Sequence, residues 1–144
     1  LNQMTIACVE QLIQLALQKD IDLGVEQRQE LNIHGQSSTL HSIIYNLIDN
    51  AIKYTPQQGV INVTIFQQAP HAILQIEDSG TGIDPALFNQ IRQRFYRIHN
   101  HAEIGSGLGL SIVDKATQRL GASLDFSKST SLGGLCVQVK FPMR

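Results

Sequence analysis

The sequence predicts a two-layer α/β sandwich, in which a mixed, mostly antiparallel sheet of about five strands carries about three helices on one face. The chain has 144 residues, 42% of them hydrophobic, which is enough to bury the core of one ordinary domain. Apolar residues recur at helical spacing in some segments and alternate with polar residues in others. No internal repeat or linker is visible, so residues 1–144 are expected to form a single domain.

Helical spacing of apolar residues first predicts two long helices. One covers roughly residues 4–19, and the other covers about residues 38–54. Ser37 or Ser38 is expected to cap the start of the second helix, and Pro56 is expected to end it. The apolar residues expected on its inner face are Leu40, Ile43, Ile44, Leu47 and Ala51.

A third long helix is predicted near the C-terminus. Gly121 is expected to end this helix, since the residue after a helix often adopts the left-handed conformation that glycine allows. A carboxylate followed by proline at residues 84–85 is expected to begin a short helix, and the polar stretch 92–106 is expected to be a long mobile loop. The residues that mark the third helix are Leu108, Ile112, Ala116 and Leu120.

The segments between these helices show the alternation of apolar and polar residues that is typical of strands. Ile21, Leu23 and Val25 alternate with polar residues. After a polar turn, Leu31 and Ile33 are expected to form a short antiparallel partner for that strand. The remaining strands are expected at about residues 61–65, 73–78, 122–127 and 135–141.

Composition disfavours several classes of function. The net charge is −1 and no basic face stands out, which argues against a nucleic-acid partner. No apolar run approaches the ~20 residues that cross a bilayer, so direct membrane contact is not expected. Cys8 and Cys136 are expected to be buried thiols in a reducing compartment. The chain begins at Leu1 without an initiator Met, and we expect it to be a piece of a longer protein.

One face of the second helix carries two amides and an amine. Asn46, Asn50 and Lys53 stand at i, i+4 and i+7 and therefore share a face. An amide oxygen there can complete the coordination of a Mg²⁺ held by phosphate oxygens, and Lys53 can neutralise a phosphate. The alternative is an ordinary solvated face, with Asp49 and Lys53 forming an i,i+4 ion pair.

A carboxylate ends the fourth expected strand, directly before a glycine turn. Asp78 lies on the same side of its strand as the apolar residues, so its side chain is expected to point toward the core. Such a carboxylate needs a donor, and the amino group of an adenine is one. Gly80 and Gly82 would let the backbone approach the base. The alternative is a tight turn that leads to a helix cap at Asp84.

A glycine-rich segment opens the third long helix. Free N–H groups at such a helix start can bind phosphates, although the glycines could simply hinge the preceding loop. It is neither a Walker-type loop nor a dinucleotide fingerprint, because no Gly-Lys-Ser/Thr follows and no strand precedes it. The residues of the expected phosphate cradle are Gly105, Ser106, Gly107, Leu108, Gly109 and Leu110.

In this order the segments resemble the catalytic ATP-binding domain of bacterial two-component sensor histidine kinases, which shares the Bergerat fold with gyrase, Hsp90 and MutL. Residues 46–56 resemble the N box, 78–83 the first glycine box, 95–97 part of the F box, and 105–110 the second glycine box. The resemblance covers nearly the whole chain. Residues 94–97 and the glycine-rich segment most resemble membrane-bound sensor kinases of the QseC type.

The resemblance implies roles for individual residues. Asn50 would be the Mg²⁺ ligand, with Asn46 beside it. Lys53 and Arg97 would contact the phosphates, and Tyr54 would line the ribose or base side of the pocket. Asn46 and Arg97 would be the catalytic residues.

The remaining implied roles belong to the base pocket and the lid. Asp78 would accept a hydrogen bond from adenine, and Gly80 would lie against the base. Gly82 and Ile83 would shape the base pocket. Residues 92–104 would form a lid over the bound ATP.

Asn46 separates two activities within this group of proteins. In the ATP-hydrolysing relatives, the residue four positions before the magnesium Asn is a Glu that serves as the base for water. An amide cannot take a proton. The sequence therefore favours transfer to a histidine over hydrolysis.

Two departures from the family pattern matter. Arg92 stands where the F box usually begins with Phe. No His is followed by the acidic residue of a phosphoacceptor box, so the acceptor is expected on a separate dimerisation domain upstream.

The sequence thus predicts a protein-histidine kinase domain that binds Mg-ATP and donates the γ-phosphoryl group to a histidine elsewhere. By itself the fragment is expected to be monomeric and not to autophosphorylate. The parent is expected to be a homodimeric inner-membrane sensor with this domain in the cytoplasm and a response regulator downstream. The alternatives are an ATPase of the gyrase, Hsp90 and MutL type, or a degenerate protein-interaction module.

Overall fold

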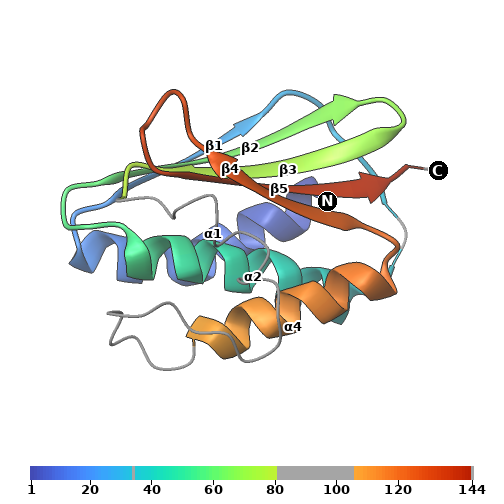
Figure 1. Cartoon of the computed structure of the whole chain (residues 1–144), viewed down its shortest axis with the longest axis horizontal. Coiled ribbons are helices and arrows are strands. Elements are labelled where there is room, and N and C mark those ends of the chain that lie inside the picture. Colours follow the sequence, from blue (N-terminus) through green and yellow to red (C-terminus); the bar gives the residue numbers. More distant parts are fainter. Residues whose placement is uncertain (34, 81–105, 144) are drawn as a thin grey trace.

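A five-stranded sheet forms one layer of the computed structural model, which describes residues 1–33, 35–80 and 106–143 (Figure 1). The strand order is β1-β2-β3-β5-β4, in which β1 and β2 are parallel and every other pair is antiparallel. The predicted mixed, mostly antiparallel sheet is therefore confirmed. The strands are β1 (Asp22–Gln27), β2 (Val60–Gln68), β3 (His71–Asp78), β4 (Ser123–Lys128) and β5 (Leu135–Pro142).

Helices form the second layer and lie on one face of the sheet, as predicted (Figure 1). They are α1 (Asn2–Gln18), α2 (Ser37–Tyr54) and α4 (Ser106–Arg119), and α2 packs against both of the others. Among the residues that the structure describes, no helix combines the length and apolarity needed to cross a membrane.

The core lies between the two layers. Every apolar residue predicted for the inner face of α2 is buried, and so are alternate residues along β2 and β3. Cys8 and Cys136 are buried free thiols, as expected. This shared core holds the C-terminal end of α2 against the sheet, because the buried stripe of α2 runs to Ala51 and Ile52.

The predicted antiparallel partner of the first strand was wrong. β1 pairs along its whole length with β2, in parallel. The backbone N–H of Leu31 instead donates to Oδ1 of Asn2 at 2.9 Å, and Ile33 forms a single antiparallel bridge with Met143. A side chain and a distant strand thus take the hydrogen bonds that a local hairpin would have used.

The cap predicted for α2 was also wrong. Neither Ser37 nor Ser38 caps the helix; the N-cap residue is Gln36, and its side chain makes no capping hydrogen bond. Both serines already lie within the helix. Their hydroxyls are therefore not in the extended conformation from which a capping side chain reaches the free N–H groups.

Spacing predicted the existence of α4 and the burial of Ala116, but it was wrong about Ile112. Ile112 is 48% exposed, whereas Val113, Ala116 and Thr117 are buried. The buried face of α4 is therefore turned toward Val113 and Thr117 and away from Ile112. Gly121 follows the helix with a φ of +66°, as predicted for its left-handed end.

Lys19 is expected to stabilise the end of α2 that faces the candidate site. Its Nζ donates to the carbonyl oxygens of Ile52 at 2.8 Å and Lys53 at 3.2 Å. These carbonyls belong to the last turn, where a cation satisfies free acceptors and the helix dipole. Lys19→Met should lower the free energy of unfolding in urea by about 1 kcal/mol. The exposed Lys128→Met is the control, and an equal loss in both variants would contradict the role of Lys19.

Candidate functional site

Asp78 is a buried carboxylate at the end of β3. Its side chain is 7% exposed and lies on the core side of the strand, as predicted. Oδ1 accepts hydrogen bonds from the backbone N–H groups of Gly80 at 2.9 Å and Leu135 at 3.1 Å. Burial raises the pKa of Asp78, and these two backbone hydrogen bonds partly oppose the rise.

The second oxygen of this carboxylate, Oδ2, differs from the first in its contacts. No hydrogen bond to Oδ2 of Asp78 comes from the part of the chain that the structure describes. Asp78 as a whole is 7% exposed, and a carboxylate with so little access to water is costly to ionise unless donors satisfy its oxygens. The geometry therefore fits a ligand that presents an N–H group to Oδ2.

Asn50 is a second buried polar residue whose hydrogen-bonding capacity is not fully used by the described residues. It is 8% exposed, and its Nδ2 is buried without a hydrogen-bond partner among the described residues. A buried amide normally finds partners, so its unmet capacity fits a site that receives polar ligand atoms. The nitrogen and oxygen of an amide exchange by rotation, so either can face such a ligand.

Asn46 and Lys53 make local contacts on the same helix. Nδ2 of Asn46 donates to the carbonyl oxygen of Ser42 at 2.7 Å. Nζ of Lys53 pairs with Oδ2 of Asp49 at 2.9 Å, as the alternative interpretation of this face expected. That alternative fails at Asn50, which is buried rather than solvated.

The end of α2 lies directly beside the turn that follows Asp78. A Cβ on Gly80 would come within 3.0 Å of the carbonyl oxygen of Tyr54 and 3.1 Å of Oδ1 of Asp78. Gly80 thus allows the backbone of α2 to approach the carboxylate. Figure 1 shows the ends of α2 and β3 at the same end of the molecule, together with the connection between β4 and β5 (residues 129–134) and the start of α4.

Sequence reasoning missed two residues at this place. A Cβ on Gly134 would overlap the carbonyl oxygen and Oδ1 of Asp78, and would lie 2.7 Å from the nitrogen of Gly80. Thr55 is fully buried, and its hydroxyl has no partner among the described residues. The adjacent glycines 133 and 134 before the last strand were a sequence signal for Gly134. Nothing local marked Thr55.

The structure places Tyr54, Asp78 and Gly80 side by side, whereas Asn46, Asn50 and Lys53 follow one another along the C-terminal half of α2. The other predicted site residues form two groups. The backbone of residues 106–110 forms the start of α4, as predicted for the glycine-rich segment. Gly82, Ile83, Arg97 and Gly105 lie outside the described residues, as do the expected lid and the short helix near residue 84. The predicted site residues on α2, on β3 and in the turn after it are Asn46, Asn50, Lys53, Tyr54, Asp78 and Gly80.

Residues 35–144 match the family of histidine kinase-, DNA gyrase B- and HSP90-like ATPases, and the chain belongs to that family. The family predicted from the motifs is therefore confirmed.

Individual relatives are sensor histidine kinases. The chain is 33% identical to the sensor protein QseC of Salmonella typhi over 92% of its length, and 33% identical to the sensor protein kinase PmrB of Pseudomonas aeruginosa over 98%. It spans only 29% and 30% of the length of these two relatives. The solved mycobacterial sensor histidine kinase MprB is 30% identical, with a TM-score of 0.84 over 99% of this chain and 94% of that one.

Proposed function

We propose that this chain binds Mg-ATP and donates the γ-phosphoryl group to a histidine on a separate dimerisation domain. The observation that carries the proposal is the Asp78 carboxylate, which is buried and holds two backbone donors on one oxygen and no described donor on the other. The family match and the sensor-kinase relatives support it. In this proposal residues 1–144 act as one catalytic domain.

Asp78 recognises the base in this proposal. Its Oδ2 accepts from the exocyclic amino group of adenine, while Gly80 and Gly134 hold Oδ1 and the neighbouring backbone in place. Gly82 and Ile83 shape the rest of the base pocket, and Tyr54 lines it from the end of α2. A ligand with a carbonyl at the position of the adenine amino group would face the carboxylate with an acceptor, so guanine nucleotides are disfavoured.

The polar face of α2 receives the phosphates. Asn50 supplies the amide that ligates Mg²⁺, and the ion, when bound, neutralises charge that develops on the phosphates. Lys53 and Arg97 contact phosphate oxygens. The Lys53 side chain is 38% exposed, so its pairing with Asp49 is weak enough to be exchanged for a phosphate. Residues 105–110 cradle the phosphates, and residues 92–104 close over them.

Asn46 directs the reaction toward transfer rather than hydrolysis. Its amide cannot remove a proton from water. Nδ2 of Asn46 is already committed to the carbonyl oxygen of Ser42. Catalysis in this chain is then positioning and electrostatic stabilisation, which phosphoryl transfer chiefly requires.

The parent protein in this proposal is a homodimeric inner-membrane sensor whose cytoplasmic part includes this domain. The names of the relatives as sensor proteins support this, as does the small share of their length that the chain spans. A response regulator receives the phosphoryl group from the dimerisation domain. The isolated chain is monomeric.

Transfer in trans tests the proposal. With labelled ATP and Mg²⁺, the chain alone should stay unlabelled, and the dimerisation domain of its parent protein should become labelled at histidine. Asn50→Ala should slow transfer by about 100-fold or more, as expected when one electrostatic group at the phosphates is lost. Asn62→Ala, on the exposed side of β2, is the matched control and should transfer at the wild-type rate.

Two results would contradict it. Label on this chain instead of the acceptor domain overturns the assignment as phosphoryl donor. Steady phosphate release, well above that of Asn50→Ala, would favour the ATPase alternative.

A further inference from the structure

Glu77 directly precedes Asp78 in the chain, but its side chain points to the opposite, open face of the sheet. The proposed function assigns it no role. Oε2 of Glu77 accepts hydrogen bonds from the hydroxyls of Ser129 at 2.7 Å and Ser131 at 3.2 Å. Both serines belong to residues 129–134, which connect β4 to β5 and which we call the β4–β5 turn.

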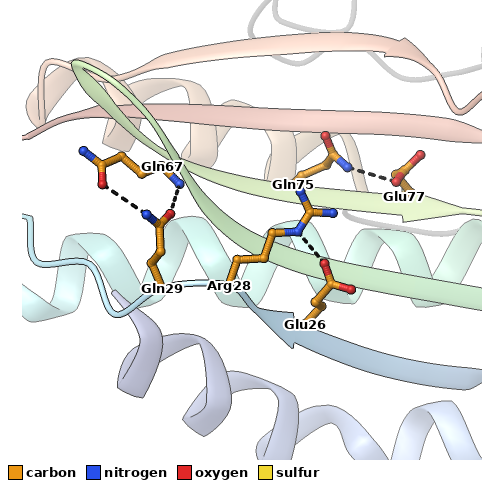
Figure 2. A network of polar contacts seen from close by, with 6 residues as sticks. All are labelled: Glu26, Arg28, Gln29, Gln67, Gln75 and Glu77. Atoms are coloured by element: carbon orange, nitrogen blue, oxygen red, sulfur yellow. Dashed lines mark hydrogen bonds and ion pairs between the residues drawn. The ribbon is translucent and has the colours of Figure 1, made fainter.

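The other oxygen of this carboxylate is held as well. Nε2 of Gln75 donates to Oε1 of Glu77 at 2.9 Å, and Figure 2 shows the two side chains bridged on β3. Gln75 is itself fixed, since Nε2 of Gln138 on β5 donates to its Oε1 at 2.6 Å. Glu77 is therefore oriented from both sides by a chain of hydrogen bonds across two strands.

Ser129 is the anchor of the β4–β5 turn. It is 1% exposed, and its hydroxyl also accepts from the N–H of Leu132 at 3.1 Å. The N–H of Ser129 donates to the carbonyl oxygen of Gly134 at 2.7 Å, and its carbonyl oxygen accepts from Gly133 at 2.9 Å. Holding Ser129 therefore fixes where the second half of the turn lies.

The last residue of the turn and the first residue of β5 supply two of the donors that hold Asp78. The N–H of Gly134 donates to the carbonyl oxygen of Asp78 at 3.1 Å, and the N–H of Leu135 donates to its Oδ1 at 3.1 Å. The two faces of β3 are thus coupled through one turn. A carboxylate on the open face anchors the turn, and the turn holds the carboxylate on the core face.

We propose that Glu77 is a positioning residue of the nucleotide site, which holds the β4–β5 turn through Ser129 and Ser131 so that Gly134 and Leu135 keep Asp78 in place. The inference rests on the proposed role of Asp78 in binding adenine. Glu77 itself touches no ligand.

The test compares Glu77→Ala with a carboxylate removed elsewhere on the sheet. Glu26 pairs with Arg28 at 2.5 Å, and both side chains are 61% exposed, so Glu26→Ala is the matched control (Figure 2). By calorimetry, Glu77→Ala should bind Mg-ADP about tenfold more weakly than wild type, as expected for the loss of a charged hydrogen-bond anchor. Glu26→Ala should stay within about twofold of wild type.

Ser129→Ala should reproduce the loss, and the loss in the double variant should be clearly smaller than the sum of the two single losses, because both variants break the contact between Glu77 and Ser129. Ser129→Thr keeps the hydroxyl and should restore most of the affinity. If Glu77→Ala does not fold, Ser131→Ala removes only the longer bond and should weaken binding by about threefold. Additive losses in the cycle, or unchanged affinity in Ser131→Ala, overturn the inference.

A second readout separates positioning from general destabilisation. Carboxyl NMR of Asp78 in the nucleotide-free chain should show a pKa above that of wild type in Glu77→Ala, because a backbone donor that lowers this pKa is displaced. An unchanged Asp78 titration overturns the inference even if the variant melts earlier. If wild type binds Mg-ADP and Glu77→Ala binds it equally well, the inference about Glu77 is overturned and the proposed function stands. A wild-type chain that binds no Mg-ADP overturns the proposed function instead.

Discussion

Asp78→Asn is expected to weaken Mg-ADP binding by about 100-fold or more. The amide oxygen of Asn can still accept from the N–H groups of Gly80 and Leu135, as Oδ1 of Asp78 does. The amide nitrogen then stands where Oδ2 was. It presents a donor to the donating amino group of adenine, so a favourable hydrogen bond becomes a repulsive contact. Titration calorimetry of both proteins measures the difference.

The same substitution is expected to leave the protein more stable near neutral pH. Burial raises the pKa of Asp78 above its unfolded value, so the ionised form opposes folding. This cost is fully present above the folded-state pKa and disappears as pH falls below the unfolded value of about 3.9. The melting temperature of Asp78→Asn should therefore exceed that of wild type near pH 7, and the gap should close in acid.

Lost binding with retained stability distinguishes a ligand-binding carboxylate from a structural one. Asp22→Asn, on the exposed edge of β1, is the matched control and should change neither property. Unchanged Mg-ADP affinity in Asp78→Asn would show that Asp78 does not recognise the base. No heat from either protein would leave only the protein-interaction alternative.

Local periodicity predicted which way the site residues face. Asp78 shares its side of β3 with buried apolar residues, and a strand alternates its faces strictly, so the burial of Asp78 followed from parity alone. The helical period of 3.6 residues likewise places Asn50 beside the buried apolar stripe of α2. Both positions depend only on neighbours within one element.

The contacts that support the site could not be predicted in this way. Ser129 lies 52 residues from Glu77, and Leu135 lies 57 residues from Asp78, so both contacts depend on the register between β3 and β5. A single sequence does not specify that register. The parallel pairing of β1 with β2 escaped prediction because several partners were open to that short strand. These predictions failed because local sequence patterns carry no information about which distant strands pair.

Gly134→Ala is expected to destabilise the protein by about 3 kcal/mol and to abolish detectable Mg-ADP binding. The added Cβ would overlap the carbonyl oxygen and Oδ1 of Asp78 and lie 2.7 Å from the nitrogen of Gly80. These are backbone and constrained atoms, so the turn must move away. That movement breaks the hydrogen bonds from Gly134 and Leu135 to Asp78 together. Urea unfolding and calorimetry measure the two effects.

Gly133→Ala is the comparison for Gly134→Ala. Gly134 is needed because other atoms lie close to it, whereas Gly133 is needed for its backbone conformation. Gly133 has a φ of +85° and no atom within 4 Å of a built Cβ. Alanine there should cost only about 1 kcal/mol of left-handed strain and leave Mg-ADP affinity within about twofold of wild type. If Gly133→Ala lost as much affinity as Gly134→Ala, the mobility of the turn would control binding. Loss in Gly134→Ala alone shows that close approach of this backbone to Asp78 is what the nucleotide site requires.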